Sequence, residues 1–225
     1  MLVLAAVTQA QTFTTLNNFH GVDFSNAGVV RDATGDLYGT TAGGGDFNCE
    51  PPNGCGAVFE LTTDGTFIVL VTFEGANGIG PATPVVRDRS GNIYGTTAAG
   101  GSGGGGTIFK IDTAKNETVL HNFSYLSGQD CSPAQGLVMD KSGNLFGTTS
   151  SSDCNHPGGT IFKIDSAGKF TVLHNFSGAP SDGSYPNYGH LTMDKGGNLY
   201  GVTERGGSAS CIDWWGPGGC GYCTR

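Results

Sequence analysis

The sequence is short of charge, and the charge it carries is unbalanced. Only 13% of its 225 residues are charged, about half the usual share for a soluble domain. Eleven lysines and arginines stand against 19 aspartates and glutamates, which gives a net charge of −8. A nucleic-acid-binding protein needs a basic surface to neutralise phosphates, and a polybasic membrane anchor needs clustered lysines and arginines. The composition argues against both classes, so no nucleic-acid partner is expected.

Long apolar runs and helical periodicity are also missing. No stretch approaches the roughly 20 apolar residues that cross a bilayer, so no transmembrane segment is expected in this chain. No stretch keeps the 3.6-residue apolar period of an amphipathic helix. The chain instead contains 40 glycines and 9 prolines, which are turn-forming residues. These features predict an all-β protein with short strands and many turns.

The N-terminus and the cysteines indicate export. Residues 2–7 are apolar and are followed by small residues at Thr8 and Ala10, which fits a signal peptide cleaved after Ala10 that lacks its basic start. The alternative is an ordinary first strand. Seven cysteines fit an oxidising compartment. We therefore interpret residues 1–10 as a signal-peptide remnant and residues 11–225 as a single repeat domain, located extracellularly or in the cell envelope.

The organising feature is a tandem repeat. One ten-residue block occurs four times, at residues 32–41, 88–97, 140–149 and 194–203. Its shared positions are an aspartate (Asp32, Asp88, Asp140, Asp194) and an aromatic residue (Tyr38, Tyr94, Phe146, Tyr200). Two further blocks recur at residues 57–61, 107–111 and 160–164, and at residues 13–19, 67–73, 117–123 and 170–176. The repeat units are predicted at residues 11–20 (one strand), 21–73, 74–123, 124–176 and 177–225 (incomplete).

Each unit reads as four short strands joined by two tight turns and two longer connections. Four antiparallel strands recurring every 50 or so residues are typical of a β-propeller blade. The prediction is a β-propeller-like array of four-stranded antiparallel blades with about 3.5 repeats, a fragment of a longer ring. A β-solenoid is the alternative, but its repeats are shorter and lack two different tight turns. The four aspartates are interpreted as turn residues, and the four aromatic residues as buried between neighbouring units.

The repeated blocks resemble a known family. The run Gly-Asn-Leu-Tyr-Gly-Thr-Thr, then Gly-Gly, Gly-Thr-Ile-Phe-Lys-Ile-Asp and Thr-Val-Leu-His-Asn-Phe, is similar to the bacterial GloVer tandem repeat of exported choice-of-anchor proteins. The resemblance covers essentially residues 13–222. It implies an extracellular, envelope-associated bacterial protein with no established catalytic residues. Residues 219–223 depart from the pattern where a third strand of the last unit should begin, so we expect the anchor in a missing C-terminal part.

Candidate binding residues come from the connections that vary between units. In an up-and-down blade the long connections emerge at one end, and binding usually resides in such loops. Single-copy aromatic and histidine residues there suit a glycan or protein surface: Phe47, Tyr125, Tyr185, Tyr188, His190, Trp214 and Trp215. The alternative is that these side chains only pack their own loops.

The cysteines fall into three local pairs in the same connections. The predicted disulfides are Cys49–Cys55, Cys131–Cys154 and Cys211–Cys220, which leaves Cys223 over. A zinc site is the alternative, but only residues 220–223 have the Cys-x-x-Cys spacing, and no second pair accompanies them. His121 and His174 recur at one strand position in different units, so metal binding is not expected there. No metal and no cofactor are predicted.

Two classes of function remain, with a third as the simplest possibility. The favoured hypothesis is a cell-surface binding or adhesion module that contacts a glycan or a surface protein through its variable loops. The alternative is a carbohydrate-active hydrolase or lyase on the same scaffold, which is an analogy at the level of the fold. The third is a purely structural surface array. The loop acids Asp130, Asp153, Asp182 and Asp213 could form an acid pair, but nothing in the sequence pairs them. We find no Ser/His/Asp set or phosphate loop that would decide for an enzyme.

Overall fold

The chain is built from short antiparallel strands. The computed structural model describes residues 15–16, 27–125, 132–133, 135–150, 158–186 and 190–206. Every helix or strand within these ranges is a strand, so the all-β prediction is confirmed there. Across the same ranges, no helix has the length and apolar character needed to span a membrane. The predicted signal-peptide remnant at residues 1–10 lies outside the described residues.

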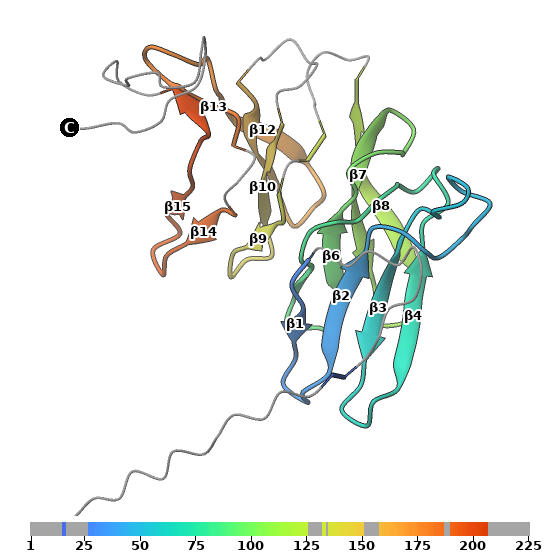
Figure 1. Ribbon diagram of the computed structural model, residues 1–225. Coiled ribbons are helices and arrows are strands. Elements are labelled where there is room, and N and C mark those ends of the chain that lie inside the picture. Colours follow the sequence, from blue (N-terminus) through green and yellow to red (C-terminus); the bar gives the residue numbers. More distant parts are fainter. Residues whose placement is uncertain are drawn as a thin grey trace, which may run out of the picture.

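Three four-stranded sheets follow one another along the chain (Figure 1). The first has the order β1 (Val30–Arg31), β2 (Leu37–Thr41), β3 (Ala57–Leu61) and β4 (Phe67–Thr72). The second has the order β5 (Val86–Arg87), β6 (Ile93–Thr96), β7 (Gly104–Ile111) and β8 (Glu117–Ser124). The third comprises β9 (Val138–Met139), β10 (Leu145–Thr149), β11 (Thr160–Ile164) and β12 (Phe170–Asn175). Sequence order equals spatial order in each sheet, as in an antiparallel meander.

The fourth unit contributes two small strand pairs. β14 (Thr192–Met193) pairs with β15 (Leu199–Tyr200) around the fourth copy of the turn. β13 (Gly183–Ser184) pairs with β16 (Arg205–Gly206), although both segments were expected to be irregular connections. Backbone pairing in these connections depends on residues that do not recur between units, so the repeat gave no signal for it.

Strand β7 begins earlier than the repeat predicts. Its third-strand block was expected from Thr107, but Gly104 already pairs with Ser124 across a bulge. Glycine tolerates the bulge because Gly104 and Gly106 have φ values of 77° and 97°, a region that favours glycine. The glycine-rich segment therefore extends the second sheet beyond the length of its neighbours.

The repeated Asp-x-x-Gly turns form as the sequence predicts. In the second unit the Asp88 carboxylate accepts hydrogen bonds from the backbone N–H groups of Ser90 and Asn92, both at 2.9 Å. Gly91 takes a φ of 92°, where a Cβ atom would be strained. Aspartate caps the turn and glycine closes it, which explains why both recur in every unit.

The hydrophobic core lies between consecutive sheets. One cluster joins Tyr38 and Phe73 of the first unit to Val85, Phe109 and Ile111 of the second. The next cluster joins the second unit to the third and contains Ile108, Phe123, Leu137, Leu145, Phe162 and Ile164. A single two-sided sheet exposes both faces, so each sheet is stabilised by burying one face against the next.

A glycine in the second strand of each sheet makes room for a phenylalanine of the third strand. A Cβ atom at Gly39, Gly95 or Gly147 would stand 2.5 Å from the Cζ atom of Phe59, Phe109 or Phe162. Contacts this short are sterically forbidden. The Gly-Thr-Thr and Ile-Phe blocks therefore recur together because one supplies the space that the other fills.

The shared aromatic position is not uniformly buried. Tyr38 is buried with 6% exposure, and Tyr94 and Phe146 are half-buried. Tyr200 is 54% exposed, so the expectation of burial between units is wrong for this residue. The reason is that, among the described residues, no four-stranded sheet follows β15 to cover it.

Candidate functional site

The meander gives the molecule two chemically different ends. The tight-turn end consists of seven short turns between paired strands, at residues 32–36, 62–66, 88–92, 112–116, 140–144, 165–169 and 194–198. The loop end carries the longer connections, which emerge opposite these turns (Figure 1). The variable segments and the invariant turns are therefore separated by the length of a strand.

The loop that follows β2 is tied down at its base. Cys49 and Cys55 form a disulfide with a Cα–Cα distance of 5.5 Å, as the local pairing predicts. Cys55 is fully buried in the core cluster of the first two sheets. The Gly44 N–H donates to the Asn53 carbonyl at 2.8 Å, which closes the loop from the other side. The predicted pairs Cys131–Cys154 and Cys211–Cys220, and Cys223, lie outside the described residues.

Two of the candidate ligand-binding residues present aromatic rings to solvent at the loop end. Phe47, in the disulfide-bonded loop, is 56% exposed, and Tyr125, directly after β8, is 45% exposed. A half-exposed ring on a tied loop is available to stack on a ligand without first ordering the backbone.

Two other candidates take part in the packing of the protein. Tyr185 has a φ of 60°, and its ring lies 5.0 Å from the guanidinium carbon of Arg205. His190 lies close to Gly136, where a Cβ atom would meet its Nδ1 atom at 3.4 Å. Tyr188, Trp214 and Trp215 lie outside the described residues. Of the described candidates at the loop end, Phe47, Tyr125 and His190 are exposed, and Phe47 and Tyr125 are the two that present a large apolar ring.

A histidine–carboxylate pair at the loop end has no counterpart in the sequence motifs. The Nε2 atom of His174 lies 3.0 Å from Oδ2 of Asp182, and the backbone N–H of Ser177 donates to the same oxygen at 3.0 Å. The hydrogen bond from the Ser177 backbone holds the pKa of Asp182 below its ordinary value, and the bond to His174 adds to this. The Ser177 hydroxyl also contacts Asp182, at 3.4 Å. Both His174 and Ser177 therefore contact the carboxylate of Asp182. In a catalytic triad the histidine lies between the serine and the carboxylate, so this arrangement is not a triad.

Each repeated turn aspartate at the tight-turn end accepts hydrogen bonds from donors of its own turn. Besides its two backbone donors, Asp88 accepts from the Asn92 side chain at 2.7 Å and from the Tyr94 hydroxyl at 3.1 Å. Burial raises the pKa of Asp88, but the Asn92 and Tyr94 hydrogen bonds outweigh it and leave the pKa below its ordinary value. Burial together with the bond to Asp88 raises the pKa of Tyr94 to about 12. The structure assigns a turn-forming contact to each of Asp32, Asp88, Asp140 and Asp194.

Arg87 joins the first sheet to the second. Its Nη1 atom lies 2.8 Å from Oδ2 of Asp32, and its guanidinium carbon lies 3.9 Å above the ring of Tyr38. The Tyr38 hydroxyl donates to Glu60 at 2.8 Å, and burial raises the pKa of this tyrosine. The charge of Arg87 is therefore shared between a carboxylate and an aromatic face of the preceding unit.

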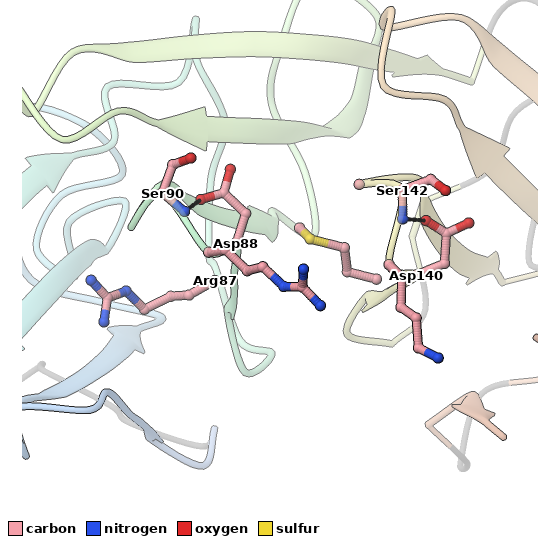
Figure 2. Close-up of a pocket in the computed structure, with 9 residues that line it drawn as sticks. Arg87, Asp88, Ser90, Asp140 and Ser142 are labelled. Carbon is pink, nitrogen blue, oxygen red and sulfur yellow. Dashed lines mark hydrogen bonds between the residues drawn. The ribbon is translucent and has the colours of Figure 1, made fainter. Parts of the chain in front are cut away.

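Two cavities lie at the tight-turn end, between the first strands and turns of neighbouring sheets. The cavity between the second and third units has a volume of about 410 Å³, and the cavity between the first and second units about 460 Å³. Both are lined by Arg87, Asp88, Arg89 and Ser90. Figure 2 shows Asp88 and Asp140 on opposite sides of the first cavity, each held by its own serine N–H, with Arg87 pointing away from Asp140. These cavities were not predicted, because most of their residues belong to turns that we interpreted as purely structural.

A third cavity is mainly apolar and lies next to the fourth unit. It has a volume of about 320 Å³ and is lined by Thr148, Ile161, Phe176, Gly183, Pro186, Leu191, Gly201, Val202 and Thr203. The described residues contain no group of three His, Cys, Asp or Glu side chains that could hold a metal ion.

Comparison with known proteins finds distant structural likenesses. A search of curated proteins finds no match. The extracellular domain of a protein described as a hybrid two-component system of B. thetaiotaomicron has a TM-score of 0.49 and 20% identity, over 81% of this chain and 21% of that one. A gluconolactonase of Xanthomonas campestris has a TM-score of 0.48 and 11% identity, over 82% of this chain and 65% of that one. This chain therefore spans less than two thirds of the length of either protein.

The family assignment rests on a sequence match that covers nearly the whole chain. The model of the Gloeobacter/Verrucomicrobia repeat matches residues 3–214. This range contains all four copies of the Asp-x-x-Gly block and all three four-stranded sheets. The resemblance to the GloVer repeat is thus confirmed: the chain belongs to the Gloeobacter/Verrucomicrobia repeat family.

Proposed function

We propose that this protein is an exported, surface-associated binding module whose loop end contacts a glycan or a surface protein. Membership of the repeat family and a disulfide in a surface loop support an extracellular or envelope location, because disulfides persist in oxidising compartments. In this proposal the three sheets are blades of a β-propeller-like array, which presents its variable connections on one face.

The observation that carries the proposal is the presence of two exposed aromatic rings at the variable end, one of them on a disulfide-bonded loop. Phe47 and Tyr125 are 56% and 45% exposed, although a soluble domain gains by burying such rings. The disulfide holds the Phe47 loop against the core, so little conformational entropy is lost when a ligand binds there. Stacking of an aromatic ring on a sugar face or an apolar side chain suits this arrangement.

A glycan array and a surface-protein pull-down test the proposal with one matched pair of variants. Phe47→Ala combined with Tyr125→Ala removes the two rings, and Val69→Ala removes an equally exposed apolar side chain from β4. We expect the double variant to lose the binding shown by the wild-type protein and Val69→Ala to retain it. Binding that survives the loss of both rings would contradict the proposed face. A wild-type protein that binds nothing in either format would favour a purely structural array.

A second candidate is a carbohydrate-active hydrolase or lyase, and the His174–Asp182 pair favours it. A carboxylate that orients an imidazole is an arrangement suited to general-base chemistry, and the two groups are 3.0 Å apart at the surface. Release of reducing ends from a polysaccharide panel tests this candidate. Activity that His174→Ala abolishes would support it, whereas a wild-type protein that releases no products would remove it.

A further inference from the structure

The cations of this acidic protein gather at the tight-turn end. Six exposed basic side chains lie in or next to the turns: Arg31, Arg89, Lys115, Lys141, Lys169 and Lys195. At the loop end, the described residues include one cation, Arg205, and five acids, Asp46, Glu50, Glu74, Asp182 and Glu204. The tight turns also carry eight aspartates: Asp32, Asp36, Asp64, Asp88, Asp112, Asp140, Asp165 and Asp194. This end is therefore not positively charged overall, and an anion would bind there through individual cations rather than through the net charge of the surface.

Asp88 and Asp140, the acids of the cavity between the second and third units, do not form ion pairs with Arg89 or Lys141. Asp140 accepts hydrogen bonds from the backbone of Ser142 at 2.8 Å and from the backbone and side chain of Asn144 at 2.9 and 2.6 Å. Asp88 accepts four hydrogen bonds in a similar way, three from donors of its own turn and one from the Tyr94 hydroxyl on β6. Within the part of the chain that the structure describes, neither Arg89 nor Lys141 forms an ion pair.

The cavity between the second and third units combines these free cations with hydroxyl groups. Arg89 and Ser90 come from one turn, and Lys141 and Ser142 from the equivalent turn of the next unit. Arg87 also lines the cavity, but its Nη1 atom is engaged by Asp32. Two corresponding turns therefore each contribute a cation and a serine to the lining of one space, and Figure 2 shows Ser90 and Ser142 on opposite sides of it.

We propose that this cavity binds a small anionic sugar, with Arg89 and Lys141 contacting its carboxylate or phosphate and the hydroxyls of Ser90 and Ser142 contacting its neutral groups. A volume of about 410 Å³ lies in the range of small-molecule sites. Guanidinium and ammonium groups are the usual partners of carboxylates and phosphates. A long polyanion is disfavoured because the rest of the molecule is acidic. This site is separate from the loop end, so it goes beyond the proposed function.

Isothermal titration of the whole chain tests the site with four probes: galacturonate, glucose 6-phosphate, inorganic phosphate and glucose. We expect both sugar anions to bind, inorganic phosphate to bind more weakly, and glucose not to bind. Added sodium chloride should weaken binding, because it screens exposed charges. Preference for galacturonate or for glucose 6-phosphate tells whether the site is built for a carboxylate or a phosphate.

The variants use substitutions that the repeat itself tolerates. Ala33 occupies the position of Arg89 in the first unit, so Arg89→Ala keeps the turn. We expect Arg89→Ala or Lys141→Ala to weaken binding about tenfold each, the effect of losing one charge-assisted hydrogen bond. Lys195→Ala is the matched control, because Lys195 has the same turn position and exposure but lines neither cavity. Absence of binding by the wild-type protein, or equal losses in the control, would overturn the proposal whatever the loop end binds.

Discussion

Arg87 is a polar side chain that stabilises the contact between the first two sheets. It satisfies Asp32 at 2.8 Å and covers the ring of Tyr38, and both contacts cross from one unit to the next. Hydrogen bonds from Thr34, opposed by burial and assisted by Arg87, hold the pKa of Asp32 well below its ordinary value. The contact was not predictable from the repeat, since Met139 and Met193 stand at the same position in the later units.

Arg87→Met should therefore destabilise the protein even though the chain uses methionine at the equivalent sites. Removing the arginine leaves a partly buried carboxylate without its cation, so we expect the free energy of unfolding to fall by about 1–3 kcal/mol. Urea denaturation followed by tryptophan or tyrosine fluorescence measures the change. Arg89→Met, two residues on and exposed, serves as the control and should change stability by less than about 0.5 kcal/mol.

Removing the charge of Glu117 should stabilise the protein, whereas removing the charge of Arg87 should destabilise it. The corresponding residues of the other units are Phe67 and Phe170, so a carboxylate occupies a position that is otherwise aromatic. Burial raises the pKa of Glu117 above its ordinary value of 4.5, a hydrogen bond from Asn77 opposes this rise, and the charge of Glu74 adds to it. The folded state thus binds this proton more tightly than the unfolded state, and stability is lost as the pH rises through the folded pKa.

Glu117→Gln keeps the acceptor for Asn77 and removes the charge, so it should raise the free energy of unfolding at pH 7. The gain should shrink as the pH falls towards 4.5, because the wild-type carboxyl is then protonated too. Thermal melts at pH 7 and pH 4.5 measure both effects, and the exposed Glu50→Gln should show neither. A Gln variant that is less stable at pH 7 would contradict this interpretation.

At the scale of the element, the pairing of a glycine strand with a phenylalanine strand explains much of each sheet. The repeat predicted both strands and both tight turns, because turn chemistry and alternation are local properties. It could not predict the start of β7 at Gly104 or the pairing of β13 with β16. Both depend on segments that occur once, for which repetition gives no information.

Gly95→Ala tests the close approach between β6 and β7. The new methyl group would stand 2.5 Å from Cζ of Phe109, so overpacking should lower the free energy of unfolding by about 1–3 kcal/mol. Gly28→Ala is the control, because its Cβ would meet nothing closer than 4.0 Å. Combining Gly95→Ala with Phe109→Leu should recover part of the loss, since the two residues share one space. Equal stability of the two alanine variants would refute the packing argument.

At the scale of the whole molecule, the sequence predicted the order of the sheets but not what lies between them. The meander and the separation of short turns from long connections follow from repetition, and the family follows from the resemblance of the repeated blocks. The polar cavities and the His174–Asp182 pair do not, because each arises where residues distant in the repeat pattern meet in space. Of the predicted loop-end residues, Phe47 and Tyr125 are exposed and remain a proposal for binding.

Two valines at the first sheet are half-exposed. Val29 and Val69 are 51% and 50% exposed. Exposed apolar surface of this kind promotes association, so light scattering should show an apparent mass that rises with concentration. Val69→Lys should reduce this rise, whereas Lys169→Ala, at the exposed third-sheet turn, should not. A wild-type protein that stays monomeric at all concentrations would contradict the prediction.

The stacking of consecutive sheets through their aromatic side chains is the claim on which the two-ended architecture depends. The rings of His121 on β8 and Phe170 on β12 lie 3.9 Å apart and nearly parallel, and those of Phe73 and Phe109 lie 5.2 Å apart. Nuclear Overhauser effects between the aromatic protons of each pair measure this directly in solution. Strong cross-peaks for both pairs are the predicted result. Their absence, with the Phe162–Val172 contact within the third sheet still present, would show that the sheets form but do not stack.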